Sequence, residues 1–286
     1  MNVEAITARL AVRFGPEVAE WCAAAPALTA RVSSQWGLEV GDLIDDGGSS
    51  VVLRCTWTDG TPAILKLTPD QGFLASQAEM LRSLAPSGRV PAVFAVAEEA
   101  IVLEAVVPGT EASPTPEQWG ELVKALHSVP PPPDLTRTLR GRVEEFVVRI
   151  GRRAAEPAIA ARVSPELWDR TVARCRALLD SPTREVLLHG DLHPGNVLDG
   201  GALGLVAIDP KTCVGDPCFD AMDYVVEGAG KEGVEVRCAA VAEACGLDPE
   251  RLLEWSRVNA TLAAIGRLTW GDGSEEELAE LLAFAR

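Results

Sequence analysis

Two turns of this sequence carry side chains suited to metal binding and proton transfer. The first turn holds Asp191 and Asn196 in an Asp-x-x-x-x-Asn spacing, directly after an apolar pair. The second holds Asp209, directly after the apolar run 205–208. In phosphoryl transfer a carboxylate accepts the proton of the attacking hydroxyl, while an amide and a second carboxylate hold Mg²⁺. We therefore predict that Asp191 is the catalytic base and that Asn196 and Asp209 are Mg²⁺ ligands.

Two histidines, His189 and His193, flank the predicted base. On a helix this spacing would suit zinc, but Gly190, Pro194 and Gly195 indicate a loop. We therefore expect both histidines to be structural. The sequence also lacks the Gly-x-x-x-x-Gly-Lys-Ser/Thr, His-Glu-x-x-His and Gly-x-Ser-x-Gly motifs, which disfavours P-loop, zincin and serine-hydrolase chemistry.

A longer pattern runs through both turns. It reads His189-Gly190-Asp191 to Asn196, then Ile208-Asp209-Pro210-Lys211, then Gly215-Asp216-Pro217-Cys218-Phe219-Asp220. This pattern resembles the aminoglycoside phosphotransferase family, and is most similar to its branch of streptomycin 6-phosphotransferases and hydroxyurea kinases. The resemblance implies a bilobal protein-kinase-like fold, transfer of the ATP γ-phosphoryl group to a hydroxyl, and a bracing role for His189 in the catalytic loop. It is strongest over 187–224 and fainter over 38–108.

Nucleotide-binding residues are expected in the fainter region. Lys66 lies in the apolar run 63–67, where a buried ammonium needs an anion such as the nucleotide phosphates and the helix residue Glu79. A lysine reaching solvent from an edge strand would look the same. The turn residues Gly48, Ser49 and Ser50 could cover the phosphates, although a plain hairpin turn is equally compatible. The resemblance implies that the backbone of Glu104 and Val106 bonds the adenine.

The hydrophobic pattern predicts an α+β protein with an N-terminal five-stranded antiparallel sheet and a mainly helical C-terminal lobe. Helical spacing covers residues 1–30, with a break at Pro16. The expected strands are 37–43, 51–57, 63–67, 92–96 and 100–106, with a helix at 72–84 before the fourth. Later helices are expected at 117–129, 139–155, 165–180, 217–228, 232–245, 248–270 and 274–285. A segment rich in Pro, Ser and Thr divides a nucleotide-binding lobe, 1–105, from a lobe carrying the catalytic loop and substrate site, 106–286.

Composition limits the partners and the location. The formal net charge of −16 disfavours nucleic acid, because a phosphate backbone requires basic surface. A cationic ligand suits this charge, and so does solubility alone. No apolar run could span a membrane and no secretory signal precedes the first helix, so we expect a cytoplasmic protein acting as a monomer or weak homodimer. Seven scattered cysteines without a Cys-x-x-Cys pair disfavour a zinc site or a disulfide framework.

The segment after Asp209 distinguishes the kinase classes. It reaches Asp216 within a few residues and lacks Ala-Pro-Glu, which leaves no room for the activation loop of a protein kinase. Asp216-Pro217 is typical of a helix N-cap followed by proline at the first helical position. The charges of Asp220 and Asp223, in the next turns, are expected to interact favourably with the positive end of the same helix dipole.

We predict a small hydroxylated substrate, first a cationic streptomycin-like aminoglycoside whose phosphorylation confers resistance. Hydroxyurea, another small metabolite or an amino sugar is the alternative, as is a non-catalytic nucleotide-binding protein. ATP and Mg²⁺ are the expected cofactors, with GTP left open. Acidic residues of the second lobe could hold a cationic substrate, although solvated helix faces explain them as well: Glu227, Glu232, Asp272 and Glu275.

Overall fold

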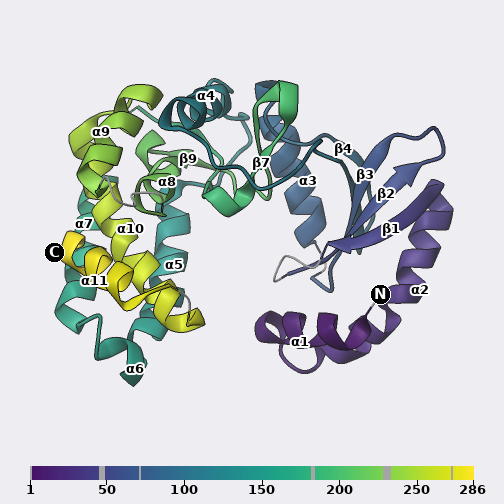
Figure 1. The fold of residues 1–286 in the computed structure, drawn as a ribbon, viewed down its shortest axis with the longest axis horizontal. Helices are drawn as coiled ribbons and strands as arrows, with labels where there is room; N and C mark the ends of the chain where they lie inside the picture. The colour runs from purple at the N-terminus through teal and green to yellow at the C-terminus, as the bar shows by residue number, and fades with distance from the viewer. Residues whose placement is uncertain (1, 45–48, 71, 182–183, 228–232, 272) are drawn as a thin grey trace. The chain divides into compact units, whose positions relative to one another are not determined.

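The computed structural model describes the chain except for residues 1, 45–48, 71, 182–183, 228–232 and 272. It forms two compact units, one of residues 1–85 with 90–109 and one of residues 86–89 with 110–286. Figure 1 shows a sheet with helices in the first unit and mainly helices in the second. The predicted α+β class is therefore confirmed. The functions predicted for the lobes 1–105 and 106–286 stay predictions.

The first unit is built on one antiparallel sheet with the strand order β1-β2-β3-β5-β4. Its strands are β1 (Leu38–Ile44), β2 (Val51–Trp57), β3 (Pro62–Leu67), β4 (Val93–Val96) and β5 (Ala100–Glu104). Its helices are α1 (Val3–Phe14), α2 (Val18–Trp36) and α3 (Phe73–Leu84), and the 3₁₀ helix η1 (Ala85–Ser87) follows. The predicted strands match, except that β5 ends at Glu104 and leaves Val106 outside the sheet.

The alternation of side chains along β3 separates the two faces of this sheet. Leu65 and Leu67 point into the apolar core that the strands share with α1 and α2. Lys66 lies between them, so its side chain must point to the opposite face. The strand registers place Val52 and Ile101 directly beside Lys66. The lysine is buried there, with 6% of its surface exposed.

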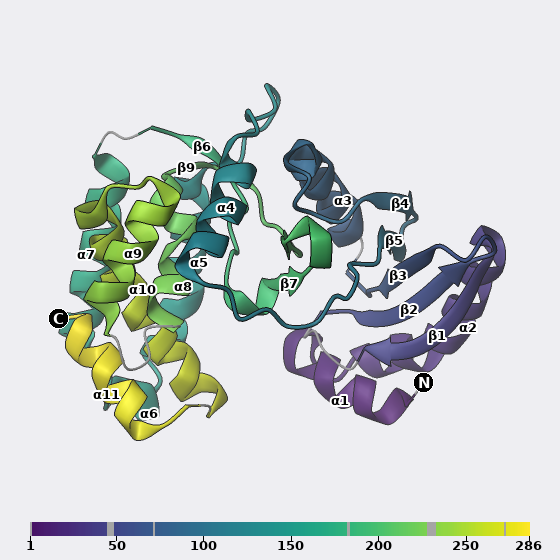
Figure 2. The ribbon, with the colours of Figure 1, turned by 45° about the horizontal axis from the view of Figure 1, so that its top comes forward.

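The second unit packs its helices around α10 (Pro249–Trp270) (Figure 2). Within the part of the chain that the structure describes, α10 contacts α5 (Leu139–Ala154), the short α6 (Pro157–Ala160), α7 (Pro165–Asp180), α8 (Met222–Glu227), α9 (Val234–Cys245) and α11 (Glu275–Phe284). The remaining α-helix is α4 (Pro116–His127). Asp248 caps α10 by accepting a hydrogen bond from the Arg251 amide, at 2.9 Å. Among the described residues, no helix is long and apolar enough to cross a membrane.

Two small antiparallel sheets interrupt these helices. One pairs β6 (Val186–Leu188) with β9 (Cys213–Gly215), and the other pairs β7 (Val197–Asp199) with β8 (Leu205–Ala207). Three short 3₁₀ helices lie along the same stretch of chain: η2 (Pro194–Asn196), η3 (Gly201–Leu203) and η4 (Pro217–Asp220). The sequence predicted the strands before Asp191 and Asp209. It did not predict β7 and β9, because three-residue strands carry almost no periodic signal.

The helix predicted at 217–228 is wrong in its first turn. Asp216 is an N-cap and Pro217 follows at the first position, as predicted, but the segment that they begin is the 3₁₀ helix η4. The α-helix α8 starts only at Met222. The Asp220 side chain is buried in η4 and accepts a hydrogen bond from the backbone amide of His189.

Candidate active site

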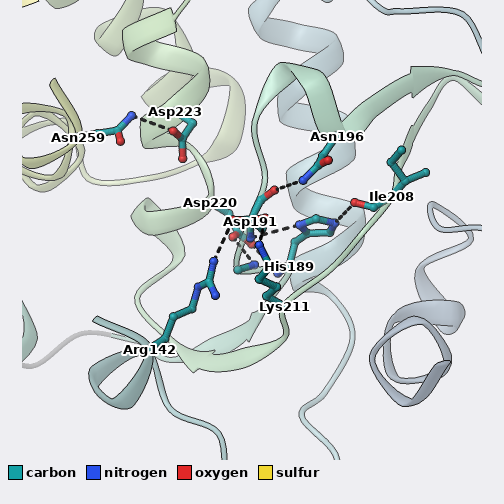
Figure 3. Close-up of polar contacts among 10 residues, drawn as sticks. Arg142, His189, Asp191, Asn196, Ile208, Lys211, Asp220, Asp223 and Asn259 are labelled. Atoms are coloured by element: carbon teal, nitrogen blue, oxygen red, sulfur yellow. Dashed lines mark hydrogen bonds and ion pairs between the residues drawn. The ribbon is translucent and has the colours of Figure 1, made fainter. Parts of the chain in front are cut away.

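The strands of the second unit place the predicted base and the first predicted metal ligand beside each other. Asp191 follows β6, and Asn196 ends η2 immediately before β7. The Asn196 Nδ2 atom donates to the Asp191 carbonyl oxygen at 2.9 Å, as Figure 3 shows. This bond fixes the orientation of the amide, because only the nitrogen can donate. The Oδ1 atom of Asn196 is therefore the one that can bind a metal ion.

The register of β7 with β8 brings Asp209 to the same end of this small sheet. Val197 pairs with Ala207, and the Ile208 amide donates to the Asn196 carbonyl oxygen at 2.9 Å. Asp209 comes next and has a φ of 55°, in the left-handed region that non-glycine residues seldom adopt. Such backbone conformations cost free energy and gather at functional sites. The structure therefore places the two predicted metal ligands on adjacent chain segments.

Asp220 is the carboxylate that holds the loop around the predicted base. It accepts hydrogen bonds from the backbone amides of His189, at 2.7 Å, and Gly190, at 2.8 Å. His127 of α4 contacts the same carboxylate through Nε2 at 3.0 Å. Burial alone would raise the pKa of Asp220, but the hydrogen bond and charge of His127 outweigh it and keep the pKa low. Asp220 lies in the first turn of η4, near the helix start as predicted, and its carboxylate also bonds the loop.

His189 braces the loop through its ring. The ring is fully buried, and its Nε2 atom lies 3.0 Å from the Ile208 carbonyl oxygen. Its Nδ1 atom accepts the Asp191 amide, at 3.4 Å, so the proton of the neutral ring belongs on Nε2. Burial lowers the pKa of His189, which keeps the ring neutral. The neutral ring ties the residue before Asp209 to the amide of Asp191, which is the structural role expected for it.

Gly190 allows the loop to pass close to the following turn. Its φ is 79°, and a Cβ atom there would meet the carbonyl oxygen of Lys211. The Lys211 amide donates to the His189 carbonyl oxygen at 2.8 Å, which extends the pairing of β6 with β9. Only glycine fits this close approach.

Two cations hold the carboxylate of Asp191. Arg142 of α5 donates from Nη2 to Oδ1 at 2.9 Å, and Lys211 approaches Oδ2 with its ammonium at 2.5 Å (Figure 3). Burial would raise the pKa of Asp191, but the charge and hydrogen bond of Lys211 lower it, and Arg142 and His193 lower it further. The net pKa lies below the ordinary value, so Asp191 is ionised and able to accept a hydroxyl proton.

A second carboxylate lies near this cluster on α8. Asn259 of α10 donates to Asp223 at 3.0 Å. Burial first, and then the charge of Glu227, raise the pKa of Asp223 to about 8, while the bond from Asn259 lowers it. The charge of Asp191 also raises this pKa, which shows that the two carboxylates are electrostatic neighbours. Asp223 lies in the first turn of α8, near the helix start as predicted, and also contacts α10.

The other acidic residues predicted to hold a cationic substrate differ in their surroundings. Glu275 pairs with Arg162 at 2.5 Å and is 80% exposed, so it forms a surface ion pair. Glu227 lies one turn beyond Asp223 on α8. Glu232 and Asp272 lie outside the described residues.

The predicted nucleotide residues belong to the first unit. Lys66 is buried on β3, whereas Glu79 lies on the exposed side of α3. The buried polar residue of α3 is Gln77, 3% exposed. The predicted pairing of Lys66 with Glu79 therefore stays a prediction, with Gln77 as a neighbouring alternative that the sequence did not indicate.

The predicted phosphate turn and hinge are only partly described. Gly48 lies outside the described residues. Ser49 accepts the Thr68 hydroxyl on its carbonyl oxygen at 2.8 Å, and the Ser50 hydroxyl is buried without a partner among the described residues. At the hinge, the Glu104 amide donates to the Ala92 carbonyl oxygen at 2.8 Å. The nucleotide roles of these residues and of Val106 remain predictions.

The donor set suits a hard divalent cation. No group of three or more His, Cys, Asp or Glu side chains in the described part of the chain could hold a metal ion. An amide oxygen and one carboxylate remain at the end of the β7–β8 sheet, and Mg²⁺ typically takes few protein oxygens beside phosphates and water. Asn196 and Asp209 therefore fit Mg²⁺ delivered with a nucleotide.

Solved structures of similar architecture define the class of fold. An amicoumacin kinase, solved with AMP-PNP and Ca²⁺, superposes with a TM-score of 0.68 over 91% of each chain, at 15% sequence identity. This likeness shows the predicted protein-kinase-like fold, which small-molecule kinases also have.

Sequence relatives identify the family. The sequence model of the aminoglycoside/hydroxyurea antibiotic resistance kinases matches residues 35–271. Streptomycin 6-kinase of Streptomyces griseus is 31% identical over 259 residues, which cover 85% of this chain and 82% of that protein. Hydroxyurea phosphotransferase of Kitasatospora aureofaciens is 30% identical over 269 residues, which cover 90% and 77%. The chain belongs to the aminoglycoside/hydroxyurea antibiotic resistance kinase family, as the resemblance implied. A kinase takes its phosphoryl group from a nucleotide, so membership in this family implies the use of a nucleotide.

Three residues around the base were not predicted as part of the site: Arg142, Lys211 and Asp220. Arg142 comes from α5, far from the motif in sequence, and nothing in its surroundings indicates a role. Lys211 does carry a signal, because the chain has only four lysines and this one follows Asp209 closely. Asp220 was noticed, but its partners could not be inferred without the path of β6 and η4.

Proposed function

We propose that this protein transfers the γ-phosphoryl group of ATP to a hydroxyl of a streptomycin-like aminoglycoside, and so confers resistance. One observation carries the proposal. In the second unit, hydrogen bonds hold the loop of Asp191 and Asn196 beside the segment that carries Asp209, in a member of a kinase family. We propose with it the predicted division of roles, in which the lobe 1–105 binds the nucleotide and the lobe 106–286 carries catalysis and the substrate.

The proposed transfer is direct. The substrate hydroxyl loses its proton to the Asp191 carboxylate as its oxygen forms a bond to the γ-phosphorus. The bond from that phosphorus to the oxygen bridging the β-phosphate breaks, and ADP leaves with the electron pair. Asp191 is suited to this step because its carboxylate is ionised and its position is fixed by the loop. No covalent intermediate with the enzyme is required.

Asn196 and Asp209 would hold Mg²⁺, which when bound neutralises phosphate charge. ATP is the proposed donor, with Lys66 and its partner on the phosphates, Ser49 and Ser50 near them, and the Glu104 and Val106 backbone on the adenine. Asp209→Ala should weaken Mg-ATP binding by about 10-fold or more, because one charged ligand is lost. Calorimetric titration with Mg-ATP and with ATP in EDTA checks this. The two titrations should differ for the wild type and nearly coincide for the variant.

A cationic substrate suits the charge of the second unit near Asp191. Asp223 and Glu227 share one face of α8, and burial first, then the charge of Glu227, raise the pKa of Asp223 to about 8. A bound cation would favour the ionised form of Asp223. All seven cysteines are unpaired and buried, which suits the reducing cytoplasm where ATP is available. We propose action there as a monomer or weak homodimer.

An ATP-consumption screen tests the function. Its acceptors are streptomycin, other aminoglycosides, amino sugars and hydroxyurea, each with mass analysis of the product. We expect turnover with streptomycin and a product heavier by one phosphoryl group. Turnover with hydroxyurea alone would favour the second candidate, which the similarity to the hydroxyurea phosphotransferase supports. Binding of Mg-ATP without transfer to any acceptor would support a non-catalytic protein and overturn the proposal.

A further inference from the structure

Both oxygens of the predicted base are already occupied by cations. Arg142 holds Oδ1 of Asp191 at 2.9 Å and Lys211 holds Oδ2 at 2.5 Å. Asp191 is partly accessible, with 27% of its side chain exposed. A substrate hydroxyl must hydrogen-bond to one of these oxygens before its proton can be accepted. A carboxylate oxygen can accept two hydrogen bonds, so the hydroxyl competes with the two cations for the exposed side of Asp191 and not for a lone pair. Movement of one cation would open this approach.

The two cations differ in how firmly they are held. The Arg142 side chain is 23% exposed, and its Nε atom is buried without a partner among the described residues. Most of its planar guanidinium group is enclosed by protein, which leaves it little room to move away from Asp191. The Lys211 side chain is 45% exposed and ends a flexible four-carbon stem. Lys211 is therefore the cation that can move away from Asp191.

The backbone of Lys211 is held by hydrogen bonds, whereas its side chain is flexible and partly exposed. Its amide is bonded to the His189 carbonyl oxygen at 2.8 Å, and its own carbonyl oxygen lies against Gly190. The ammonium can thus move only within the reach of its own stem. Asp209, a predicted metal ligand, lies two residues earlier on the same turn. A phosphoryl group held near Asp209 would therefore lie beside the turn that carries Lys211.

The residue type supports this placement. The chain has 26 basic residues, of which only Lys66, Lys124, Lys211 and Lys231 are lysines. An arginine at 211 could bind the carboxylate with two parallel hydrogen bonds and would remain there. A lysine behaves as a point charge that can exchange one oxygen anion for another.

We infer that Lys211 is a further catalytic residue, which leaves Asp191 for the phosphoryl group during transfer while Arg142 stays as the positioning residue. This inference depends on the phosphotransfer proposed above. Lys211 keeps its proton throughout and forms no covalent bond. Its ammonium stabilises the negative charge on the non-bridging oxygens of the phosphoryl group, and its departure opens the approach of the substrate hydroxyl to Oδ2.

A transition-state mimic separates this role from simple bracing of Asp191. The titrations measure binding of Mg-ADP with and without aluminium fluoride, a planar mimic of the phosphoryl group. Both use the acceptor that the wild-type enzyme phosphorylates. Lys211→Met should leave Mg-ADP affinity within about two-fold, lose most of the tightening caused by the fluoride, and lower kcat by about 10²- to 10³-fold. Arg142→Met is the matched variant, and it should lower kcat but keep the fluoride-dependent tightening.

Three outcomes would overturn the inference. Lys211→Met could keep the full fluoride-dependent tightening, it could keep wild-type kcat, or both variants could lose the tightening equally, which would mean that Lys211 acts only through Asp191. Because the Lys211 side chain is partly exposed, its replacement should leave the melting temperature nearly unchanged, and thermal melts verify that each variant is folded. A wild-type protein without any phosphotransfer would instead refute the proposed function, so the two failures are distinguishable.

Discussion

The predicted catalytic residues of the second unit and the predicted nucleotide residues of the first are positioned in different ways. In the second unit, side chains bond the loop directly, as Asn196 does to Asp191 and Asp220 does to the Gly190 amide. In the first unit, Lys66 is placed by strand register, and Glu104 by the path of its backbone. Positioning by side chains requires particular residue types, and positioning by backbone does not. We therefore expect activity to be more sensitive to single substitutions in the second unit than in the first.

The largest expected effect is at the base. Asp191→Ala should lower kcat by about 10²- to 10⁴-fold and leave Mg-ATP affinity nearly intact, because a general base contributes to transfer and little to nucleotide binding. Steady-state kinetics and calorimetry measure the two quantities. Asp199→Ala is the matched control, since Asp199 lies at the end of the nearby β7 and only caps the Gly201 amide. A variant at Asp191 with near-wild-type kcat would show that another group accepts the proton.

The next effect is on stability, at the carboxylate that holds the catalytic loop. Asp220→Asn replaces an acceptor of three buried donors by an amide, and should lower the free energy of unfolding by about 2–4 kcal/mol. Urea denaturation measures the change. Asp180→Asn removes a surface ion pair with Arg140 and should cost at most about 1 kcal/mol. Equal effects of the two substitutions would mean that the Asp220 contacts do not hold the loop.

The pH dependence of the Asp220 effect has a definite sign. Its folded-state pKa is lowered, so its contribution to stability is present above the unfolded pKa and is lost as the pH falls through the folded one. The difference in unfolding free energy between wild type and Asp220→Asn should therefore shrink toward acid pH. A difference that grows on acidification would contradict the lowered pKa.

The sequence predicted those parts of the site that depend on local residue order. Asp191 and Asp209 follow short apolar runs, Asn196 comes five residues after Asp191, and the loop glycines and proline excluded a helix around Asp191 and Asn196. The five strands of the antiparallel sheet were also predicted, because period-two alternation and a hairpin turn mark them. Their order, in which β5 lies between β3 and β4, was not predicted.

The sequence could not predict contacts made across distant elements. Arg142 approaches Asp191 from α5, and Asp220 reaches back to His189 from η4. Both contacts depend on how the two small sheets pack against the helices, which no local pattern encodes. The same limit affects Lys66, because helical spacing alone does not show whether Gln77 or Glu79 faces inward.

The partner of Lys66 is the point at which the first unit can be tested in the same way. Lys66→Met should lower kcat/KM for ATP by about 10- to 100-fold, the equivalent of about 1.5–3 kcal/mol for a charged hydrogen bond. Glu79→Gln should follow it in direction if the predicted pairing is correct. Kinetics at varied ATP concentration measure both, and Glu39→Gln on the exposed part of β1 is the control. If Glu79→Gln keeps the wild-type kcat/KM for ATP and Gln77→Leu lowers it, Gln77 is the partner of Lys66.

The smallest effect concerns Asp223, whose folded pKa is raised to about 8 by burial and by Glu227. The unfolded chain ionises this group near its ordinary value of about 3.9. The folded protein therefore holds an extra proton between these values, and the stability that this proton confers is lost as the pH rises toward 8.

Wild-type unfolding free energy should consequently fall by about 1–2 kcal/mol more than that of Asp223→Asn between pH 5 and 8.5. Denaturation at the two pH values measures this, with Asp169→Asn on the exposed face of α7 as the control. If wild type and Asp223→Asn have the same pH slope, the carboxylate is already ionised. The α8 pair would then offer a cationic substrate two full negative charges at neutral pH, without any proton to release on binding.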